Sequence, residues 1–512
     1  MVSRKDQLNA YTFARRRTVA AFLQPTPARS EEGAPRPVRT ILPSIVAGTL
    51  LLAGFGAWGI IKPAAPPDWK EPGKYILVGS ESTTRYVVLR TDGRKQLHPV
   101  LNLASARLVL DPGEFTIVKV KESELDKGGL HHGATIGIPY APDRLPRAQD
   151  ARTAKTWAAC IRPDQGGSNP SSQRSVLVLA SDADKAKVGR GHPGTLKGRQ
   201  ALYAEGPDGT RYLIDAKGTR YPIGGKEAAD DPEYLDLLLR PLFRQGAQPQ
   251  RVTAEWLDTF NEGTPITFPV VEDMGAPAGV KGLPPAVNRV GKVLRAPAGP
   301  VVQSYVVLKG RVAPVSDLVA ELLLRQKAAE SLYPGQPKAV DVAAQSLTPD
   351  PERFYGDRGW PEQVPEQVND VITPGGRDVA CSVYHGRTSA NGRHRLSVWA
   401  GTDTPLPVAP GGAGTYVTPG SGLLFREVQG TATGTGSTYL LTDTGLRYGI
   451  QVNSDSPAAK TKETPAERRQ GEAQTRLGYG GIRPVPVPAA WAGLLSKGPT
   501  LDTAAALQPQ GS

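Results

Sequence analysis

The longest run of hydrophobic positions extends from residue 41 to residue 61 and contains no charged side chain. An α-helix rises about 1.5 Å per residue, so a helix of this length crosses roughly the 30 Å hydrocarbon core of a bilayer. Pro43 lies near the start of the run, where its missing N–H costs little, and Trp58 lies near the other end, at headgroup depth. The pattern predicts a single transmembrane helix over residues 41–61.

Two other interpretations of this run fit less well. A cleaved secretory signal has a shorter apolar region, of about 7–15 residues, behind a short basic segment and before a small-residue cleavage site. Here residues 1–40 precede the run, and a Pro-rich segment follows it. A buried helix of a globular core is rarely apolar on all sides over such a length. We therefore expect an uncleaved membrane anchor.

The distribution of charge predicts the orientation of this anchor. The basic residues that precede the run are Arg4, Lys5, Arg15, Arg16, Arg17, Arg29, Arg36 and Arg39. Only Lys62, Lys70 and Lys74 follow it closely. Because excess Lys and Arg stays on the cytoplasmic side, we expect residues 1–40 in the cytoplasm, a single pass through the plasma membrane, and the rest of the chain outside it.

Residues 3–23 have the pattern of a short basic helix, and residues 24–40 that of an extended linker. Ser3 is a suitable N-cap residue, with Asp6 three positions later. The hydrophobic residues near one helix face are Leu8, Tyr11, Val19 and Phe22, with arginines among them. The helix either lies on the anionic inner leaflet or contacts a cytoplasmic partner. In the second case the contact residues would be Leu8, Tyr11, Arg15 and Arg16.

Small residues recur every fourth position within the predicted membrane helix. Thr49, Ala53 and Ala57 therefore share one ridge. A ridge of small side chains lets another membrane helix approach closely. The alternative is a small-residue ridge that faces lipid, and both interpretations stay open.

Beyond a linker over residues 62–74, one pattern occurs four times. The repeats lie near residues 75–118, 200–245, 290–326 and 421–452. Each has a β-rich run, a polar or Gly-rich turn, an aliphatic strand that opens with Tyr, and a Gly turn. Helical periodicity follows at 101–110, at 315–324 and, more weakly, at 235–243. We expect four hairpin-plus-helix repeats, whose tyrosines pack inside the fold rather than form a binding surface.

The sections between the repeats are expected to form a shared β-rich core. They lie near residues 130–198, 340–400 and 475–495, with the clearest strands at 175–180, 379–384 and 396–400. Residues 402–422 are expected to be a flexible excursion, 456–474 a polar loop or exposed helix, and 483–491 an extended edge-like segment. The predicted fold class of residues 75–512 is thus α+β and β-rich, which agrees with abundant Gly (57) and Pro (48).

The chain has two cysteines, Cys160 and Cys381. Both fall in the part expected outside the membrane, where a lone pair forms a disulfide more readily than in the cytosol. The alternative is two free buried thiols. A bridge would close a loop of about 220 residues and contribute at most on the order of 5 kcal/mol.

The net charge of +12 raises the question of nucleic-acid binding. Residues 1–40 hold eight Lys or Arg against three Asp or Glu, so they contribute about +5 of this total. The remainder is only mildly basic and has no basic patch interleaved with aromatic residues. We therefore expect no nucleic-acid partner.

The sequence contains no recognisable catalytic motif. It has no P-loop to hold phosphates and no Gly-x-Ser-x-Gly nucleophile elbow. Of its six histidines, His131 and His132 are adjacent, without the i, i+4 spacing of a helical zinc pair. We expect no catalytic residue, cofactor or metal.

Several segments resemble the EccB family of actinobacterial type VII (ESX-type) secretion systems. The matching segments are 3–11, 101–107, 137–142, Trp157 with Cys160, Cys381, and 480–491. The resemblance implies a pore-complex subunit that assembles with EccC, EccD and EccE and self-associates. It also implies an elongated extracytoplasmic domain with a central core, four repeats in quasi-two-fold arrangement and one disulfide. Family members are sometimes labelled ATPases, but the missing P-loop leaves that label without a residue.

The leading hypothesis is a non-catalytic structural subunit that links the cytoplasmic machinery to an extracytoplasmic domain. The first alternative is a membrane-anchored extracytoplasmic ATPase or other hydrolase. The second is a wall-binding receptor that acts alone. The sequence does not predict the stoichiometry, the exported substrates or the ESX type.

Overall fold

The computed structural model describes most of the 512 residues. The described ranges are 3–23, 37–61, 66–112, 115–163, 172–225, 231–333, 335–408, 414–430, 436–450 and 473–510. Most of the predicted loop at 456–474 lies outside these ranges, as do parts of both linkers. The chain divides into two compact units. One contains residues 1–70, 79–82 and 119–129, and the other contains residues 71–78, 83–118 and 130–512.

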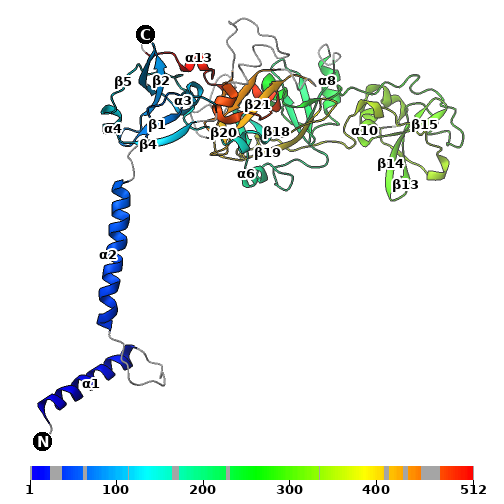
Figure 1. The fold of residues 1–512 in the computed structure, drawn as a ribbon. Coiled ribbons are helices and arrows are strands. Elements are labelled where there is room, and N and C mark those ends of the chain that lie inside the picture. Colours follow the sequence, from blue (N-terminus) through cyan, green and yellow to red (C-terminus); the bar gives the residue numbers. More distant parts are fainter. Residues whose placement is uncertain are drawn as a thin grey trace. The chain divides into compact units, whose positions relative to one another are not determined.

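The smaller unit is helical. Helix α1 spans Arg4–Leu23, as predicted, and the Ser3 hydroxyl accepts a hydrogen bond from the Lys5 N–H at 3.2 Å. Helix α2 spans Pro37–Ile61 and includes the whole hydrophobic run (Figure 1). Among the residues that the structure describes, no helix combines the length and hydropathy needed to cross a membrane. Helix α4 (Glu122–Asp126) brings Gly128 against the buried Trp69 ring.

Glu122 fixes a turn within this unit. Its Oε1 accepts hydrogen bonds from the backbone N–H groups of Glu81 (3.1 Å) and Ser82 (2.8 Å). The Ser82 N–H is the main reason why the pKa of Glu122 falls from its ordinary 4.5 to about 2. A Cβ atom at Gly79 would lie 2.3 Å from the same oxygen, so this close approach requires glycine.

The lowered pKa of Glu122 predicts a pH-dependent turn. The carboxylate contacts are complete above pH 4.5 and are lost as the pH falls towards about 2, because the protonated acid accepts these bonds poorly. The hydrogen-exchange protection factors of the Glu81 and Ser82 amides should fall over this range. Glu122→Gln should lower them already at pH 7, whereas Glu124→Gln, an exposed control, should not. Unchanged protection at pH 2 would contradict this role.

The described strands form five sheets, and the disulfide-bearing one lies within the larger unit and is central to its packing. Its strands are β6 (Thr156–Pro163), β7 (Ser172–Leu179), β18 (Val379–Thr388), β19 (His394–Gly401) and β20 (Thr415–Val417), in the order β19-β18-β6-β7-β20. The predicted strands at 175–180, 379–384 and 396–400 are thus correct. The excursion expected over 402–422 is partly wrong, because β20 pairs in parallel with β7.

The other four sheets share one plan, an antiparallel meander with short edge strands. The first contains β1 (Tyr75–Gly79), β2 (Arg85–Thr91), β3 (Arg94–Val100), β4 (Thr116–Val120) and β5 (His131–His132). The second contains β8 (Gln200–Glu205), β9 (Arg211–Asp215), β10 (Thr219–Pro222), β11 (Gln250–Arg251), β12 (Asn261–Glu262) and β17 (Glu366–Gln367). The third contains β13 (Val293–Ala298), β14 (Val301–Leu308), β15 (Arg311–Val315) and β16 (Val340–Asp341). The fourth contains β21 (Leu423–Val428), β22 (Thr438–Leu441), β23 (Leu446–Gly449), β24 (Val485–Pro488) and β25 (Ser496–Lys497).

Each meander has three strands, whereas the predicted hairpin has two. The missed strands are β3, β10, β15 and β23. Three of them contain proline (Pro99, Pro222 and Pro314), which weakens a strand pattern. All four follow the predicted Gly turn, whose glycine has a left-handed φ of +74° to +82°. The turn therefore continues the sheet rather than ending it.

The predicted helices after the meanders are present. They are α3 (Leu103–Val109), α8 (Pro232–Leu239) and α10 (Asp317–Arg325), N-capped by Asn102, Asp231 and Ser316. The remaining short helices are α5 (Ala148–Ala151), α6 (Asp182–Ala186), α9 (Ala254–Leu257), α12 (Ala489–Ala492), α13 (Thr503–Ala506) and helical turns at 327–332, 344–346, 356–358 and 475–479. Of the four strand-opening tyrosines, Tyr305 is buried and the others are half-buried, in agreement with packing.

Three hydrophobic clusters join the sheets. The largest joins the central sheet to the second and fourth through Trp157, Trp256, Phe425 and Trp491. Another joins the second and third sheets, and a further one joins helix α3, which follows the first sheet, to the fourth sheet. The segment expected in the core at 475–495 contributes Trp491 to the largest cluster, and its strand β24 belongs to the fourth sheet, whereas β16, at the start of the expected 340–400 segment, belongs to the third sheet. As predicted, the segment at 483–491 contributes an edge strand, β24.

Candidate functional site

The described residues bring no three His, Cys, Asp or Glu side chains together as potential metal ligands. His131 and His132 lie exposed on β5, which pairs in parallel with β3. His98 lies 3.0 Å from the Thr91 hydroxyl and 2.9 Å from the Ala134 carbonyl. These histidines therefore have structural positions in the first sheet.

Asp215 and Tyr221 of the second sheet, whose pKa values are both raised, also serve the fold. Burial raises the pKa values of Asp215 and Tyr221. The Asp215 carboxylate accepts hydrogen bonds from the N–H groups of Lys217 (3.0 Å) and Thr219 (2.8 Å), which closes the β9–β10 turn. The Tyr221 hydroxyl donates to the Gly359 carbonyl at 3.0 Å. Both groups are thus engaged by backbone partners.

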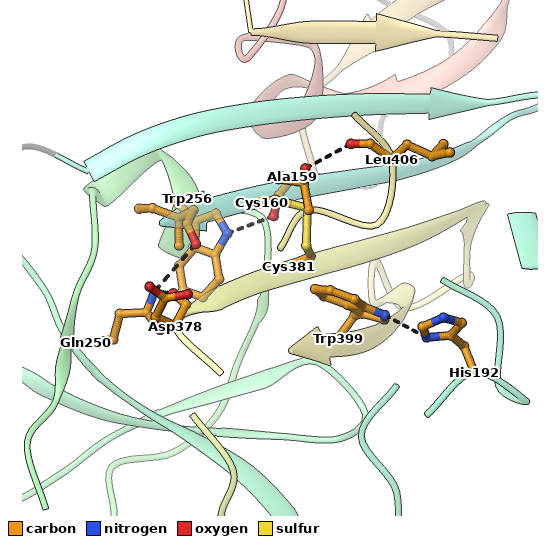
Figure 2. Close-up of a disulfide and its surroundings, with 11 residues drawn as sticks. Ala159, Cys160, His192, Gln250, Trp256, Asp378, Cys381, Trp399 and Leu406 are labelled. Atoms are coloured by element: carbon orange, nitrogen blue, oxygen red, sulfur yellow. Dashed lines mark hydrogen bonds between the residues drawn. A yellow bond between two sulfur atoms is a disulfide. The ribbon is translucent and has the colours of Figure 1, made fainter. Parts of the chain in front are cut away.

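The two cysteines form a disulfide at the centre of the larger unit (Figure 2). Cys160 on β6 and Cys381 on β18 are directly paired in the antiparallel register, and their Cα atoms are 4.0 Å apart. Both side chains are buried. The sequence separation is 221 residues, so the bond joins strands that lie far apart along the chain.

Residues from β11 of the second sheet and from the following helix α9 bond to the backbone of the two strands next to this disulfide. The Trp256 indole N–H donates to the carbonyl of Ala159, the residue before Cys160, at 2.8 Å (Figure 2). The Gln250 side-chain amide donates to the carbonyl of Asp378, just before β18, at 2.8 Å. Trp256 and Gln250 therefore hold the second sheet to both cysteine-bearing strands.

The fourth sheet presents a tryptophan in the corresponding place. Trp491 lies on α12 after edge strand β24, as Trp256 lies on α9 after edge strand β11, and both indoles are fully buried. Trp491 packs on Tyr384 of β18, with ring centroids 5.5 Å apart. Its indole N–H has no acceptor within the described part of the chain. Both helices thus pack against the cluster of the central sheet, and within the described residues the Trp256 indole donates a hydrogen bond to that sheet whereas the Trp491 indole does not.

The predicted cytoplasmic contact residues lie on the exposed surface of α1. Leu8 and Tyr11 are 66% and 68% exposed, and Arg15 and Arg16 are exposed as well. With about 100° of rotation per residue, Arg15 falls inside the stripe of hydrophobic residues. The face therefore mixes apolar and cationic groups rather than separating them.

Of the predicted helix-packing residues, Thr49 and Ala53 lie on the described part of α2. The Thr49 hydroxyl donates to the Ile45 carbonyl at 2.8 Å, so it is bonded within its own helix. The Ala57 side chain lies outside the described residues.

One exposed aromatic residue was not singled out from the sequence. Tyr140 has a left-handed φ of +61° and is 89% exposed. Its sequence setting, Pro139-Tyr140-Ala141-Pro142, marks a constrained turn, but the degree of exposure is visible only in the fold.

The chain matches one protein family along almost its whole length. The family is described as "Type VII secretion system ESX-1, transport TM domain B", and it matches residues 1–511. Among individual relatives, the ESX-3 secretion system ATPase EccB3 of Mycobacterium tuberculosis is 28% identical over 506 residues, which cover 92% of this chain and 84% of that protein. The ESX-5 secretion system ATPase EccB5 of Mycobacterium marinum is 29% identical over 523 residues, which cover 99% and 93%.

Solved structures show the same fold. A chain of an intact ESX-5 inner membrane complex has a TM-score of 0.59 at 23% identity and covers 100% of this chain and 96% of its own length. A chain from the EccB3 dimer of the ESX-3 core complex has a TM-score of 0.58 at 26% identity, with 85% and 99% covered. The protein belongs to the EccB family of type VII secretion proteins.

Proposed function

We propose that this chain is a structural, non-catalytic membrane subunit of a type VII secretion complex. It links cytoplasmic and membrane components to a folded extracytoplasmic domain. The observation that carries this proposal is the family match over residues 1–511. The described residues support a scaffold, because the central sheet is held by a buried disulfide and by tryptophan-bearing elements on either side.

The hydrophobic helix is the proposed membrane anchor. Helix α2 has 25 residues, and the sequence has no charge from 41 to 61. Its described side chains include Leu42, Leu52 and Phe55, which are 71%, 77% and 75% exposed. Such exposure of large apolar groups is costly in water and favourable in lipid. The excess of Arg before this helix puts the N-terminus in the cytoplasm and the larger unit outside the plasma membrane.

The proposed partners are EccC, EccD and EccE together with further copies of this chain. The EccB3 relative was solved as a dimer from a core complex, which supports self-association here. Within the membrane, the Thr49, Ala53 and Ala57 ridge would pack on a neighbouring helix.

The four meanders are proposed to be copies of one unit in quasi-two-fold arrangement. Each has three antiparallel strands joined by a turn with a left-handed glycine. The second and fourth sheets flank the same cluster, with Trp256 and Trp491 in matching places. The third sheet packs on the second, and helix α3, which follows the first sheet, packs on the fourth, which is the pairing expected of a quasi-two-fold axis.

An extracytoplasmic ATPase is the second candidate, because the relatives carry that word in their names. The sequence has no P-loop to hold the nucleotide phosphates. Purified full-length protein should therefore hydrolyse ATP no faster than a mock preparation. Robust turnover that one point substitution abolishes would contradict the non-catalytic assignment.

The experiment that tests the scaffold proposal is co-purification of the tagged full-length chain from native membranes. We expect the other membrane subunits of the secretion complex in stoichiometric amounts. Recovery of this chain without any other membrane subunit would contradict the proposal and favour a wall-binding receptor.

The mixed face of α1 gives a sharper form of this test. Leu8→Asp combined with Arg15→Glu should lower the recovery of cytoplasmic and membrane partners by tenfold or more, because it removes an apolar contact and reverses a charge at one interface. The matched control is Phe13→Asp, on the opposite side of the helix, where Phe13 is 64% exposed. Equal losses for both variants would contradict a specific contact.

A further inference from the structure

A cavity of about 590 Å³ lies in the larger unit, where the chain passes from the central sheet to the second sheet. Segment 193–200 contributes most of its lining, and Gln363 and Glu366 contribute the rest. The segment lies beside β19 of the central sheet at Thr195 and reaches β8 of the second sheet at Gln200. A cavity of this size accommodates a small molecule or a short stretch of peptide. We call it the 193–200 cavity.

The wall formed by segment 193–200 is fixed to the central sheet by hydrogen bonds. The Ala400 N–H of β19 donates to the Gly194 carbonyl at 2.8 Å. Just before the segment, Nδ1 of His192 accepts a hydrogen bond from the Trp399 indole N–H at 3.1 Å (Figure 2). The wall is therefore preorganised, which lowers the entropic cost of binding a ligand.

The opposite wall is joined to the same segment through β17. The Glu366 N–H donates to the Arg199 carbonyl at 2.8 Å, and β17 pairs in parallel with β8. The two side chains also form an ion pair, with 3.4 Å between Nε of Arg199 and Oε2 of Glu366. Among the described residues that line the cavity, Glu366 is the one carboxylate. It therefore leaves the positive charge of Lys197, the other lining cation, unbalanced within the lining.

The chain beside the cavity is cationic as well. From residue 185 to residue 199 the sequence has five Lys or Arg and no Asp or Glu. Thr195 is buried, and its hydroxyl donates to the Gly189 carbonyl at 2.8 Å, so the turn that carries Arg190 lies against the lining. Arg190 and Lys187 are both exposed. Cationic groups gathered in one place raise the local concentration of anionic ligands.

The polar groups of the lining match those of an extended peptide. The Gln200 side-chain oxygen accepts a hydrogen bond from the Lys197 N–H at 3.0 Å, so its NH₂ group remains as a donor. Gln363 offers both a donor and an acceptor. The described lining contains no aromatic ring on which a nucleobase could stack, and Pro193 is its one apolar side chain. Nucleobases and lipid chains are therefore poor occupants.

We propose that the 193–200 cavity binds an extended acidic segment of a partner protein. A carboxylate of that segment would pair with Lys197, and the two glutamine side chains would bond to its backbone. The inference rests on the proposed function for the compartment: the larger unit lies outside the plasma membrane there, so the partner is an extracytoplasmic protein. An anionic bilayer fits less well, because its headgroups form a flat surface whereas these polar groups line a cavity.

The test measures peptide binding to the full-length chain, purified in a non-ionic detergent. The probe is a fluorescein-labelled peptide of four Glu-Gly repeats, and the same peptide with Lys in place of Glu is the charge control. Fluorescence anisotropy gives the Kd. Lys197→Glu should raise the Kd of the acidic probe by about tenfold or more, because it replaces an attractive charge with a repulsive one. Lys281→Glu makes the same change at an exposed lysine outside the lining and should leave the Kd unchanged.

A second variant should change the affinity in the opposite direction. Glu366→Gln removes the carboxylate that pairs with Arg199 but keeps the backbone hydrogen bond between these residues. The acidic probe then meets two unbalanced cations, so its Kd should fall severalfold. A variant that merely disturbed the fold would not bind more tightly, so this result separates a binding role from a structural one.

Three results would overturn the inference. They are binding of the acidic probe no tighter than that of the Lys-Gly control, equal effects of Lys197→Glu and Lys281→Glu, and a raised Kd for Glu366→Gln. Binding of soluble short-chain phosphatidylglycerol, but not of the acidic probe, would assign the cavity to a lipid instead. Co-purification of the other membrane subunits is measured separately and tests the proposed function alone, because binding of the peptide requires no other subunit.

Discussion

Removing the disulfide with Cys160→Ala and Cys381→Ala is expected to lower the free energy of unfolding of the larger unit by up to about 5 kcal/mol. The bond restricts the unfolded chain by closing a loop across 221 residues, and this effect grows slowly with loop length. Because both side chains are buried in the central sheet, the loss affects the cluster that the second and fourth sheets share. Thermal unfolding followed by tryptophan fluorescence measures it.

The oxidised and reduced wild-type protein provide the matched comparison. A reductant present during thermal unfolding should lower the midpoint temperature of the wild type and leave that of the double variant unchanged. Peptide mapping without reduction should find Cys160 joined to Cys381. Two free thiols, or a variant as stable as the wild type, would contradict the structural role of the bond.

Trp256→Ala is expected to have the next largest effect, a loss of about 3–5 kcal/mol. The substitution opens a cavity against β6 and removes the hydrogen bond to the Ala159 carbonyl, which then stays buried without that partner. The second sheet should separate from the central sheet first, so amide exchange along β6 and β8 should rise more than along β22. Uniform or negligible changes would contradict this account.

Trp256 and Trp491 allow a paired test of the hydrogen bond itself. Trp256→Phe and Trp491→Phe remove nearly the same volume from corresponding places. Only the first removes a hydrogen bond present in the described structure. Trp256→Phe should therefore cost about 1 kcal/mol more than Trp491→Phe. Equal costs would show that the Ala159 contact contributes nothing.

The local elements could be predicted from the sequence because their signals are local. The helix from Ser3 was predicted from its capping residue, and the strand pairs from Tyr-led aliphatic runs before a glycine turn. The third strand of each meander was missed, and in three of them Pro99, Pro222 and Pro314 lie in strands whose pairing is set by the preceding turn. Such strands form through tertiary pairing, against their own propensity.

Long-range pairing was only partly predictable. Two cysteines allow one intramolecular disulfide, so the bond between Cys160 and Cys381 could be predicted. Their position directly opposite each other on β6 and β18 could not. Nothing in residues 415–417 signals parallel addition to β7. Tyr140 likewise looked like an ordinary Pro-flanked turn residue, because exposure and backbone strain depend on the surrounding segments.

The orientation of the chain across the membrane is the claim on which the scaffold account depends. Single cysteines at two exposed positions test it directly: Tyr11→Cys on α1 and Val270→Cys in the larger unit. A membrane-impermeant maleimide applied to intact protoplasts should label Val270→Cys at once, and Tyr11→Cys only after the membrane is permeabilised. Labelling of Tyr11→Cys in intact protoplasts, with Val270→Cys protected, would contradict the account.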